Sequence, residues 1–328
     1  MSKNKNSRGH EAEKPSEIPA KGWIDIGKRT ISQISDDNIQ IVSAGVAFYF
    51  FMALFPAILA MVNIYSLVIE PATIREHFSV LSNILPATAY DLITGILEPL
   101  LKQPESTIGW SLLLSILISL WSANKGTSAL FEGINIAYDE KDKRGFIKKT
   151  GLTFIFTIGA ILLFVLCILV LVFYPAFIDR LNISQAMESF IGWIRWIVIA
   201  ALFVFGMGML YKKAPDRDDP ETRWLSWGAV LSTVLWLAGS MLFSWYVDNF
   251  GSYDKVYGSF AAVIILLLWL FISAFIVLIG AEINSEMEHQ TRRDTTIGED
   301  KPMGKRNAYH ADHVAGKDLK DEKTNPES

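Results

Sequence analysis

Cysteine and histidine are scarce in this chain, and their scarcity excludes two kinds of chemistry. The single cysteine, Cys167, can form no disulfide within the chain and lies inside an apolar run, where we expect it to pack against lipid or protein. Metal-dependent hydrolysis needs clustered histidines and carboxylates, but no HxH motif and no carboxylate pair lies inside an apolar run. The five histidines are His10, His77, His289, His310 and His313. We therefore expect no enzyme activity, no metal site and no cofactor.

Signatures of nucleotide use and of serine hydrolases are also missing. There is no phosphate-binding Walker loop, so ATP-driven transport by this chain alone is not expected, and there is no Ser-His-Asp arrangement. The Lys and Arg residues near both ends are interleaved with Asp and Glu, so we expect no nucleic-acid partner. The first 40 residues are polar and precede a long apolar run, which is not typical of a cleavable signal.

Long apolar runs dominate the sequence instead. The 328 residues are 51% hydrophobic, with a mean hydropathy of +0.30. A helix that crosses a bilayer needs about 20 predominantly apolar residues, and several segments reach this length. They are 41–69, 108–136, 151–174, 192–211, 224–247 and 258–281. The sequence therefore predicts an all-α, polytopic membrane protein.

The positive charges between these runs alternate in number, and the alternation predicts the topology. The counts of Lys and Arg are seven in 1–30, two in 70–107, five in 139–150, one in 175–190, four in 212–223, one in 248–257 and eight after residue 281. Loops rich in Lys and Arg stay on the cytoplasmic side of a membrane. We therefore expect six transmembrane helices with both termini in the cytoplasm.

The remaining segments divide the chain into a membrane domain and two ends. We expect a disordered cytoplasmic arm over 1–23, a membrane domain over 24–288 that begins with a short amphipathic helix, and a disordered cytoplasmic tail over 289–328. The external loop 70–107 carries apolar residues at helical spacing and is broken by prolines, which predicts two short amphipathic helices. These helices either cap the bundle or form a lid.

The second apolar run becomes polar after Trp121, and its polar residues share one helical face. Their spacings of three and four place them in a row, and Glu282 falls at the same cytoplasmic boundary at the end of the sixth run. Charges within a span usually face the bundle interior or a hydrated cavity, but the helix could also protrude into the cytoplasm while Lys125 extends to the headgroups. The candidate polar path comprises Lys125, Ser128, Glu132, Asn135 and Glu282.

Two further features could shape a passage. Asp248, Asn249, Tyr253 and Tyr257 surround the short turn after the fifth run, where they either line an outer mouth or anchor the chain at the membrane interface. Pro56 falls in the middle of the first run, where it frees a backbone carbonyl and predicts a helix kink.

Four motifs in order resemble the YihY/BrkB family of bacterial inner-membrane proteins over residues 25–290. They are AGVAFYFFMALFP, LWSANKGTSALFEGINIAYD, LYKKAPDR followed by WGAVLSTVLW, and FGSYDKVYGSFAAVIILLLWLFISAFIVLIGAEIN. The resemblance implies a six-helix, multi-pass protein of the bacterial cytoplasmic membrane. It also implies links to serum resistance and an old ribonuclease BN label, which the scarcity of metal-ligand clusters contradicts.

Two functions fit these observations. The chain is either a translocator of a lipid or small amphiphile, or a non-transporting envelope-integrity protein that acts through protein partners. Besides the lipid bilayer, the expected partners are a second copy of the chain or an envelope protein. A translocator requires a hydrated polar cavity, whereas a structural protein packs solidly.

The charge alternation predicts the outcome of cysteine labelling in intact cells. After replacement of Cys167, single cysteines in 70–107, 175–190 and 248–257 should react with a membrane-impermeant maleimide, because these segments are external. Single cysteines in 139–150 and 212–223 should react only after permeabilisation. Labelling of 139–150 in intact cells would contradict the six-helix topology.

Overall fold

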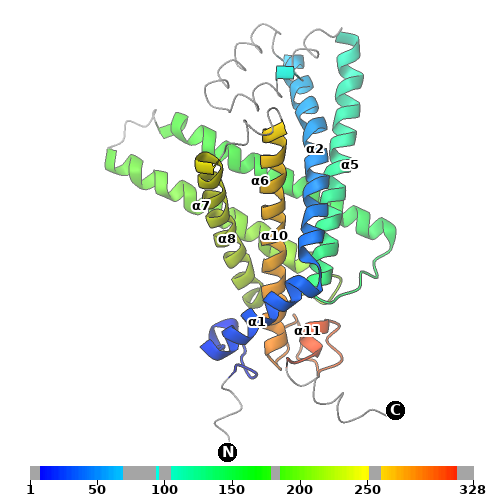
Figure 1. Cartoon of the computed structure of the whole chain (residues 1–328), viewed down its shortest axis with the longest axis vertical. Helices are drawn as coiled ribbons and strands as arrows, with labels where there is room; N and C mark the ends of the chain where they lie inside the picture. Colours follow the sequence, from blue (N-terminus) through cyan, green and yellow to red (C-terminus); the bar gives the residue numbers. More distant parts are fainter. Residues whose placement is uncertain (1–7, 69–93, 96–104, 179–184, 251–259, 316–328) are drawn as a thin grey trace, which may run out of the picture. The chain divides into compact units, whose positions relative to one another are not determined.

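The computed structural model describes residues 8–68, 94–95, 105–178, 185–250 and 260–315, and most of these residues lie in helices (Figure 1). A short 3-10 turn (Pro15–Glu17) precedes α1 (Ala20–Asp36). The long helices are α2 (Ile39–Val68), α5 (Glu105–Ala137), α6 (Phe146–Ile178), α7 (Gln185–Lys213), α8 (Thr222–Phe250) and α10 (Ala261–Gln290). The tail contains α11 (Tyr309–Asp312). The all-α prediction is confirmed for the described residues.

Five helices, α2, α6, α7, α8 and α10, are long and apolar enough to cross a membrane. Their large apolar side chains are extensively exposed, as at Leu162, Phe205 and Met241. Such surface is costly in water and is expected of helices that contact lipid. The helix α5 is as long but becomes polar after Trp121. The predicted external helices of 70–107 lie almost entirely outside the described residues.

The chain divides into two compact units. The first contains residues 1–43, 130–238 and 275–328, and the second contains 44–129 and 239–274. The core of the first unit is formed by buried side chains from five long helices, and α6 packs against α7. The largest buried members of this core are Ile39, Phe131, Ile134, Tyr138, Tyr211 and Leu278.

The second unit joins part of α2 to part of α5. The hydroxyl of Ser119 donates to the carbonyl of Ala53 at 3.4 Å. The ring of Phe50 lies where a Cβ on Gly126 would touch it, so this glycine permits close packing. Pro56 lies inside α2, which continues on both sides of it.

The two ends of the chain, for which we predict disorder, are described in part, over residues 8–23 and 289–315. Residues 8–18 contact the end of α10, where Thr291 Oγ1 donates to the Ala12 carbonyl at 2.7 Å and Gln290 Nε2 donates to the Arg8 carbonyl at 2.7 Å. Residues 291–315 also follow a defined path beside this helix end (Figure 1). These hydrogen bonds from Thr291 and Gln290 hold the backbone of residues 8–18 against the end of α10.

Two glycines allow α10 to pack closely on its neighbours in the first unit. A Cβ on Gly228 of α8 would overlap the side chain of Asn284, and a Cβ on Gly280 would overlap Ser232 and Tyr211. The absence of these Cβ atoms lets polar side chains of adjacent helices meet. By contrast, Gly208 of α7 has open space around its missing Cβ.

These glycines lead to a test of the packing. Gly228→Ala should lower the free energy of unfolding by about 1–3 kcal/mol, because Asn284 must move. Gly208→Ala should be neutral or stabilise by up to about 1 kcal/mol, since it adds only helix propensity. Thermal unfolding of both purified variants in detergent measures the difference. Equal stability of the two variants would show that the contact is not tight.

Candidate functional site

The last turns of α10 carry polar side chains that are buried on all sides. They are Glu282, Asn284, Ser285, Glu286, Glu288 and Gln290. Buried polar groups need hydrogen-bond or charge partners, and here the partners come from α1, the segment after α5, the α7–α8 connection and the tail. All of these elements belong to the first unit. The candidate site is this buried polar end of α10.

A hydroxyl network lies one turn before Glu282. The Tyr211 hydroxyl donates to the Val277 carbonyl at 2.8 Å and lies 2.8 Å from the Ser232 hydroxyl. Ser232 also lies 2.7 Å from the Gly228 carbonyl, to which it can donate. Gly280 leaves the space in which these groups meet. The network thus connects α7, α8 and α10 through polar contacts within apolar helices.

A buried ion pair lies beside this network. Arg217 Nη2 contacts the two carboxylate oxygens of Glu288 at 2.8 and 2.9 Å, and both side chains are fully buried. The guanidinium lies 4.7 Å from the ring centre of Tyr138, a favourable cation–π geometry. Thr295 Oγ1 donates to Glu288 at 2.8 Å. Burial raises the pKa of Tyr138 well above its usual value, so this phenol stays neutral.

A second group of ionisable side chains surrounds the other face of α10. His310 Nε2 lies 3.2 Å from Asp139 Oδ2, and the His310 ring packs edge-on against His289 at 4.9 Å between centres. His289 lies 3.6 Å from Glu286, which also pairs with Arg29. Burial lowers the pKa of His310, so its imidazole is neutral at pH 7.

Asp37 completes this group from the α1–α2 junction. Asp37 is the C-terminal cap of α1, and burial raises the pKa of its carboxyl to about 6. Among the described residues, no group of three or more His, Cys, Asp or Glu is arranged to hold a metal ion.

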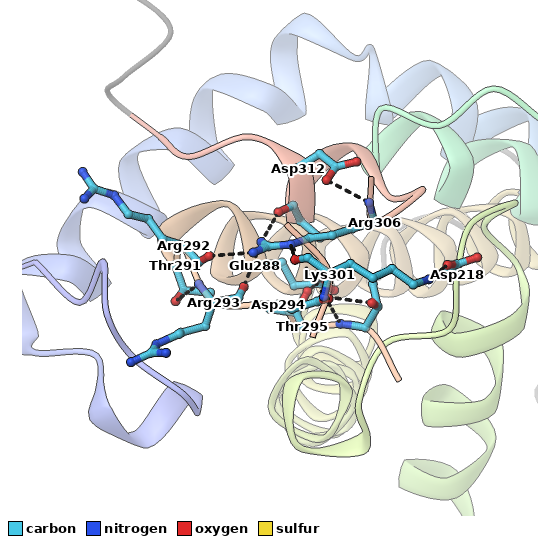
Figure 2. Close-up of polar contacts among 12 residues, drawn as sticks. Asp218, Glu288, Thr291, Arg292, Arg293, Asp294, Thr295, Lys301, Arg306 and Asp312 are labelled. Atoms are coloured by element: carbon cyan, nitrogen blue, oxygen red, sulfur yellow. Dashed lines mark hydrogen bonds and ion pairs between the residues drawn. The ribbon is translucent and has the colours of Figure 1, made fainter. Parts of the chain in front are cut away.

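The tail closes over this helix end through Arg306 (Figure 2). Its buried guanidinium donates to the carbonyls of Ala311 at 2.6 Å, Arg292 at 2.9 Å, Lys301 at 3.0 Å and Arg293 at 3.1 Å. One charged side chain thereby fixes both ends of the segment 292–311.

Two carboxylates anchor the same segment. Asp294 accepts from the backbone N–H of Lys301 at 2.8 Å. Lys301 in turn pairs with Asp218 at 2.6 Å (Figure 2), and this hydrogen bond holds the pKa of the Asp218 carboxyl below its usual value. The tail is thus joined to the α7–α8 connection as well as to α10.

The predicted polar path is divided between the two units. Glu282 and Asn135 are buried in the first unit, where Asn135 Oδ1 accepts from the Asp216 N–H at 2.9 Å. Glu132 is exposed in the same unit and pairs with Lys149 at 2.9 Å. Lys125 and Ser128 belong to the second unit, and Lys125 lies 5.7 Å from the ring centre of Trp121. That these residues form one polar path stays a prediction.

The predicted outer mouth is described only in part. Asp248 and Asn249 lie in the last turn of α8, where Asn249 Nδ2 donates to the Trp245 carbonyl at 2.8 Å. Tyr253 and Tyr257 lie outside the described residues. The assignment of a mouth stays a prediction.

Sequence reasoning missed several members of the site, some of them buried and some partly or fully exposed. They are Asp37, Tyr138, Asp139, Arg217, Glu286, Glu288, His289 and His310. One signal was available, because Glu282, Glu286 and Gln290 follow the helical spacing of four, as do Asn284 and Glu288. These spacings indicate that α10 continues past Ala281 with polar residues on more than one face.

Comparison with known proteins places the whole arrangement in a family. The family model described as Virulence factor BrkB matches residues 30–304, which include every long helix. The chain belongs to the BrkB family. The relatives include membrane proteins named UPF0761, and no solved structure matches.

Three relatives of this BrkB-family chain show the range of sequence identity and coverage. It is 31% identical over 263 residues to the putative ribonuclease-like protein YfkH of Bacillus subtilis, covering 79% of this chain and 93% of that protein. It is 27% identical to a UPF0761 membrane protein of Alteromonas mediterranea, covering 80% and 90%. It is 22% identical to one from Vibrio parahaemolyticus, covering 80% and 82%.

The role of Arg306 generates a test of tail docking. Arg306→Ala leaves several buried carbonyls without donors, and the loss should reach about 2 kcal/mol for hydrogen bonds to a charged group. Amide hydrogen exchange in 292–311 should then accelerate by roughly 30-fold.

Lys305→Ala is the matched control, because it removes the same charge from an exposed neighbour. Hydrogen exchange detected by mass spectrometry measures the exchange rate of 292–311 in both variants. If the two exchange alike, Arg306 does not hold the tail.

Proposed function

We propose that this BrkB-family protein is a multi-pass protein of the bacterial cytoplasmic membrane that moves a lipid or small amphiphile across it. The single observation that carries the proposal is the buried polar end of α10. A membrane-length helix ends there in carboxylates and amides that lie inside the protein rather than in water. Ionisable residues within or next to spans are costly and mark substrate or ion pathways.

The composition of the site favours translocation over a purely architectural role. Burying a charge costs several kcal/mol unless it is paired, and an architectural bundle achieves the same packing with apolar side chains. Here Glu288 is paired with Arg217, whereas among the described residues neither carboxylate oxygen of Glu282 has a hydrogen-bond partner. The unpaired member is the one that we assign to the path.

We also propose six spans with cytoplasmic ends, α5 providing the sixth. The segments rich in Lys and Arg contact one another within the first unit, which supports placing them on one side. Arg144 Nη2 donates to the Ala214 carbonyl at 2.6 Å, and the Tyr309 N–H donates to Glu140 at 2.7 Å. The pairs Arg29–Glu286 and Lys301–Asp218 join the arm and the tail to the same end.

The path would then enter at this cytoplasmic end. Glu282 and Asn135 would line it first, and Glu132, Ser128 and Lys125 would continue it along α5. At the opposite side, Asp248 and Asn249 of α8, together with Tyr253 and Tyr257, would form the outer mouth. This order follows from the spacing of residues along α5 and from the proposed topology.

The two alternative functions require other partners or other residues than a translocator does. A non-transporting envelope protein would need a partner, a second copy or an envelope protein, and would tolerate loss of the Glu282 charge. A nuclease would need a metal-ligand cluster, and the proposal includes none. The ribonuclease-like name belongs to YfkH and is not transferred here.

Reconstituted vesicles test the translocator. With a fluorescent phospholipid and dithionite outside, vesicles that hold the protein should lose inner-leaflet fluorescence faster than empty ones. Glu282→Gln should slow this loss by about tenfold, the factor given by about 1.4 kcal/mol on a barrier.

Glu299→Gln is the matched control, because Glu299 is exposed in the tail. If empty vesicles and vesicles with protein lose fluorescence equally for charged, zwitterionic and single-chain probes, the translocator proposal is wrong. The envelope alternative then gains support.

A further inference from the structure

One side of α1 is exposed although it carries large apolar side chains. Ile24 and Ile31 are 57% and 72% exposed, and they lie seven residues apart, so they share one face of the helix. Gly27 lies between them in the same sector and is exposed as well. We call these three residues the apolar row. Exposed apolar surface of this kind marks contact with a membrane or a partner.

Two lysines border the apolar row. At about 100° per residue, Lys21 and Lys28 lie within about 20° of each other and roughly 40–80° from the two isoleucines around the helix axis. Both lysines are exposed. The nearby carboxylate of Asp25 already binds Arg8 at 2.9 Å, and among the described residues no acidic side chain pairs with either lysine. The border of the row is therefore positively charged.

The opposite face of α1 is packed against the protein, so the helix cannot turn its apolar row inward. Ile26 is buried in a cluster with Trp224 of α8 and Met287 of α10. Arg29 forms an ion pair with Glu286 of α10. These contacts fix the rotation of α1 about its axis and leave the row and its lysines facing outward.

The contact between α1 and α8 indicates where the row lies relative to the membrane. Trp23 of α1 and Trp227 of α8 lie 5.9 Å apart between ring centres. Trp227, Val230 and Val234 are exposed at spacings of three and four along α8, a helix long and apolar enough to cross a membrane. Tryptophans gather at the membrane–water interface. The helix α1 therefore lies where the lipid-exposed face of α8 begins.

We propose that the apolar row of α1 lies in the headgroup region of the bilayer, and that Lys21 and Lys28 bind the phosphates of anionic phospholipids there. Amphipathic helices at an interface bury their apolar face at the boundary of headgroups and acyl chains, and their lysines extend to the lipid phosphates. Each lysine favours binding to an anionic surface by about fivefold, and two lysines by about 30-fold. Only the assignment to the cytoplasmic leaflet rests on the proposed topology.

The same helix connects this surface to the buried polar end of α10. Arg29 lies roughly 160° around α1 from Ile31, and its guanidinium binds Glu286 and donates to Gln290 Oε1 at 2.8 Å. Lipid contacts on one side of α1 thus hold in place the helix that supplies an arginine on its other side. Anionic lipid therefore favours the ion pair that closes this part of the candidate site.

Quenching of a fluorescent label by lipids tests the surface in the full-length protein. Gly27 suits the label, because a Cβ there meets no other atom within 4 Å and both isoleucines stay in place. After Cys167→Ala, an NBD group is attached to Gly27→Cys and the protein is reconstituted into vesicles. Phosphatidylglycerol with a nitroxide headgroup should quench the label several-fold more than nitroxide-labelled phosphatidylcholine at the same mole fraction. Salt at 1 M should reduce this preference, because it screens charges beyond about 3 Å.

Three comparisons separate the parts of the proposal. Lys21→Gln together with Lys28→Gln should abolish the preference for phosphatidylglycerol, while quenching by phosphatidylcholine persists. Lys305→Gln is the matched control, because Lys305 is an exposed lysine of the tail, and it should leave the preference unchanged. A label on Ser32→Cys, roughly 140° around α1 from Gly27, should be quenched less by both lipids.

Each contrary result overturns a stated part of the proposal. Equal quenching by the two lipids shows that the lysines bind no anionic headgroup, and this comparison needs no lysine variant to fold. Equal quenching of labels at Gly27 and Ser32 shows that the row does not face the bilayer. Absence of quenching by either lipid and by iodide in the water shows that a second copy or another protein covers the row. Failure of the translocator assay leaves all these results in force, because quenching requires no lipid movement.

Discussion

The need to satisfy buried polar groups at the end of α10 is the constraint on which the rest of the first unit depends. From Glu282 to Gln290 the helix is polar and yet buried. Each neighbouring element contributes a partner: Arg29 from α1, Arg217 from the α7–α8 connection and Thr295 from the tail. Removing one partner leaves a buried charge uncompensated, which costs far more than the pair contributes. The surrounding elements are thereby held in one arrangement.

The same constraint explains why small residues occur where helices meet. Gly228 and Gly280 bring α8 close enough for Asn284 and Tyr211 to find partners on the adjacent helix. Elsewhere on the long helices the apolar side chains face outward, as lipid contact allows. The protein thus combines long helices that expose apolar side chains with a polar end of α10. Residues 8–18 and 291–315 cover this polar end.

The long helices could be predicted because crossing a bilayer requires a continuous apolar run. The run 224–247 lies within α8, Thr222–Phe250. The end of α10 could not be placed in this way, since the run stops at 281 while the helix continues to Gln290. Its last turns are stabilised by residues far away in the sequence. Arg217 is 71 positions from Glu288 and Arg29 is 257 positions from Glu286. Glu282 and Asn135 were found from their own helices, but Arg217 and His310 take their roles only from the folded chain.

The docking of residues 291–315 has a consequence for the order of biosynthesis. The ribosome makes α10 before the tail, because synthesis proceeds from the N-terminus. The groups on α10 that need Thr295 or His310 therefore enter the membrane region without their partners. These groups on α10 acquire their partners only after the tail has been made. The last contacts of this end thus form after α10 has been made, and until then Glu288 lacks the hydrogen bond from Thr295.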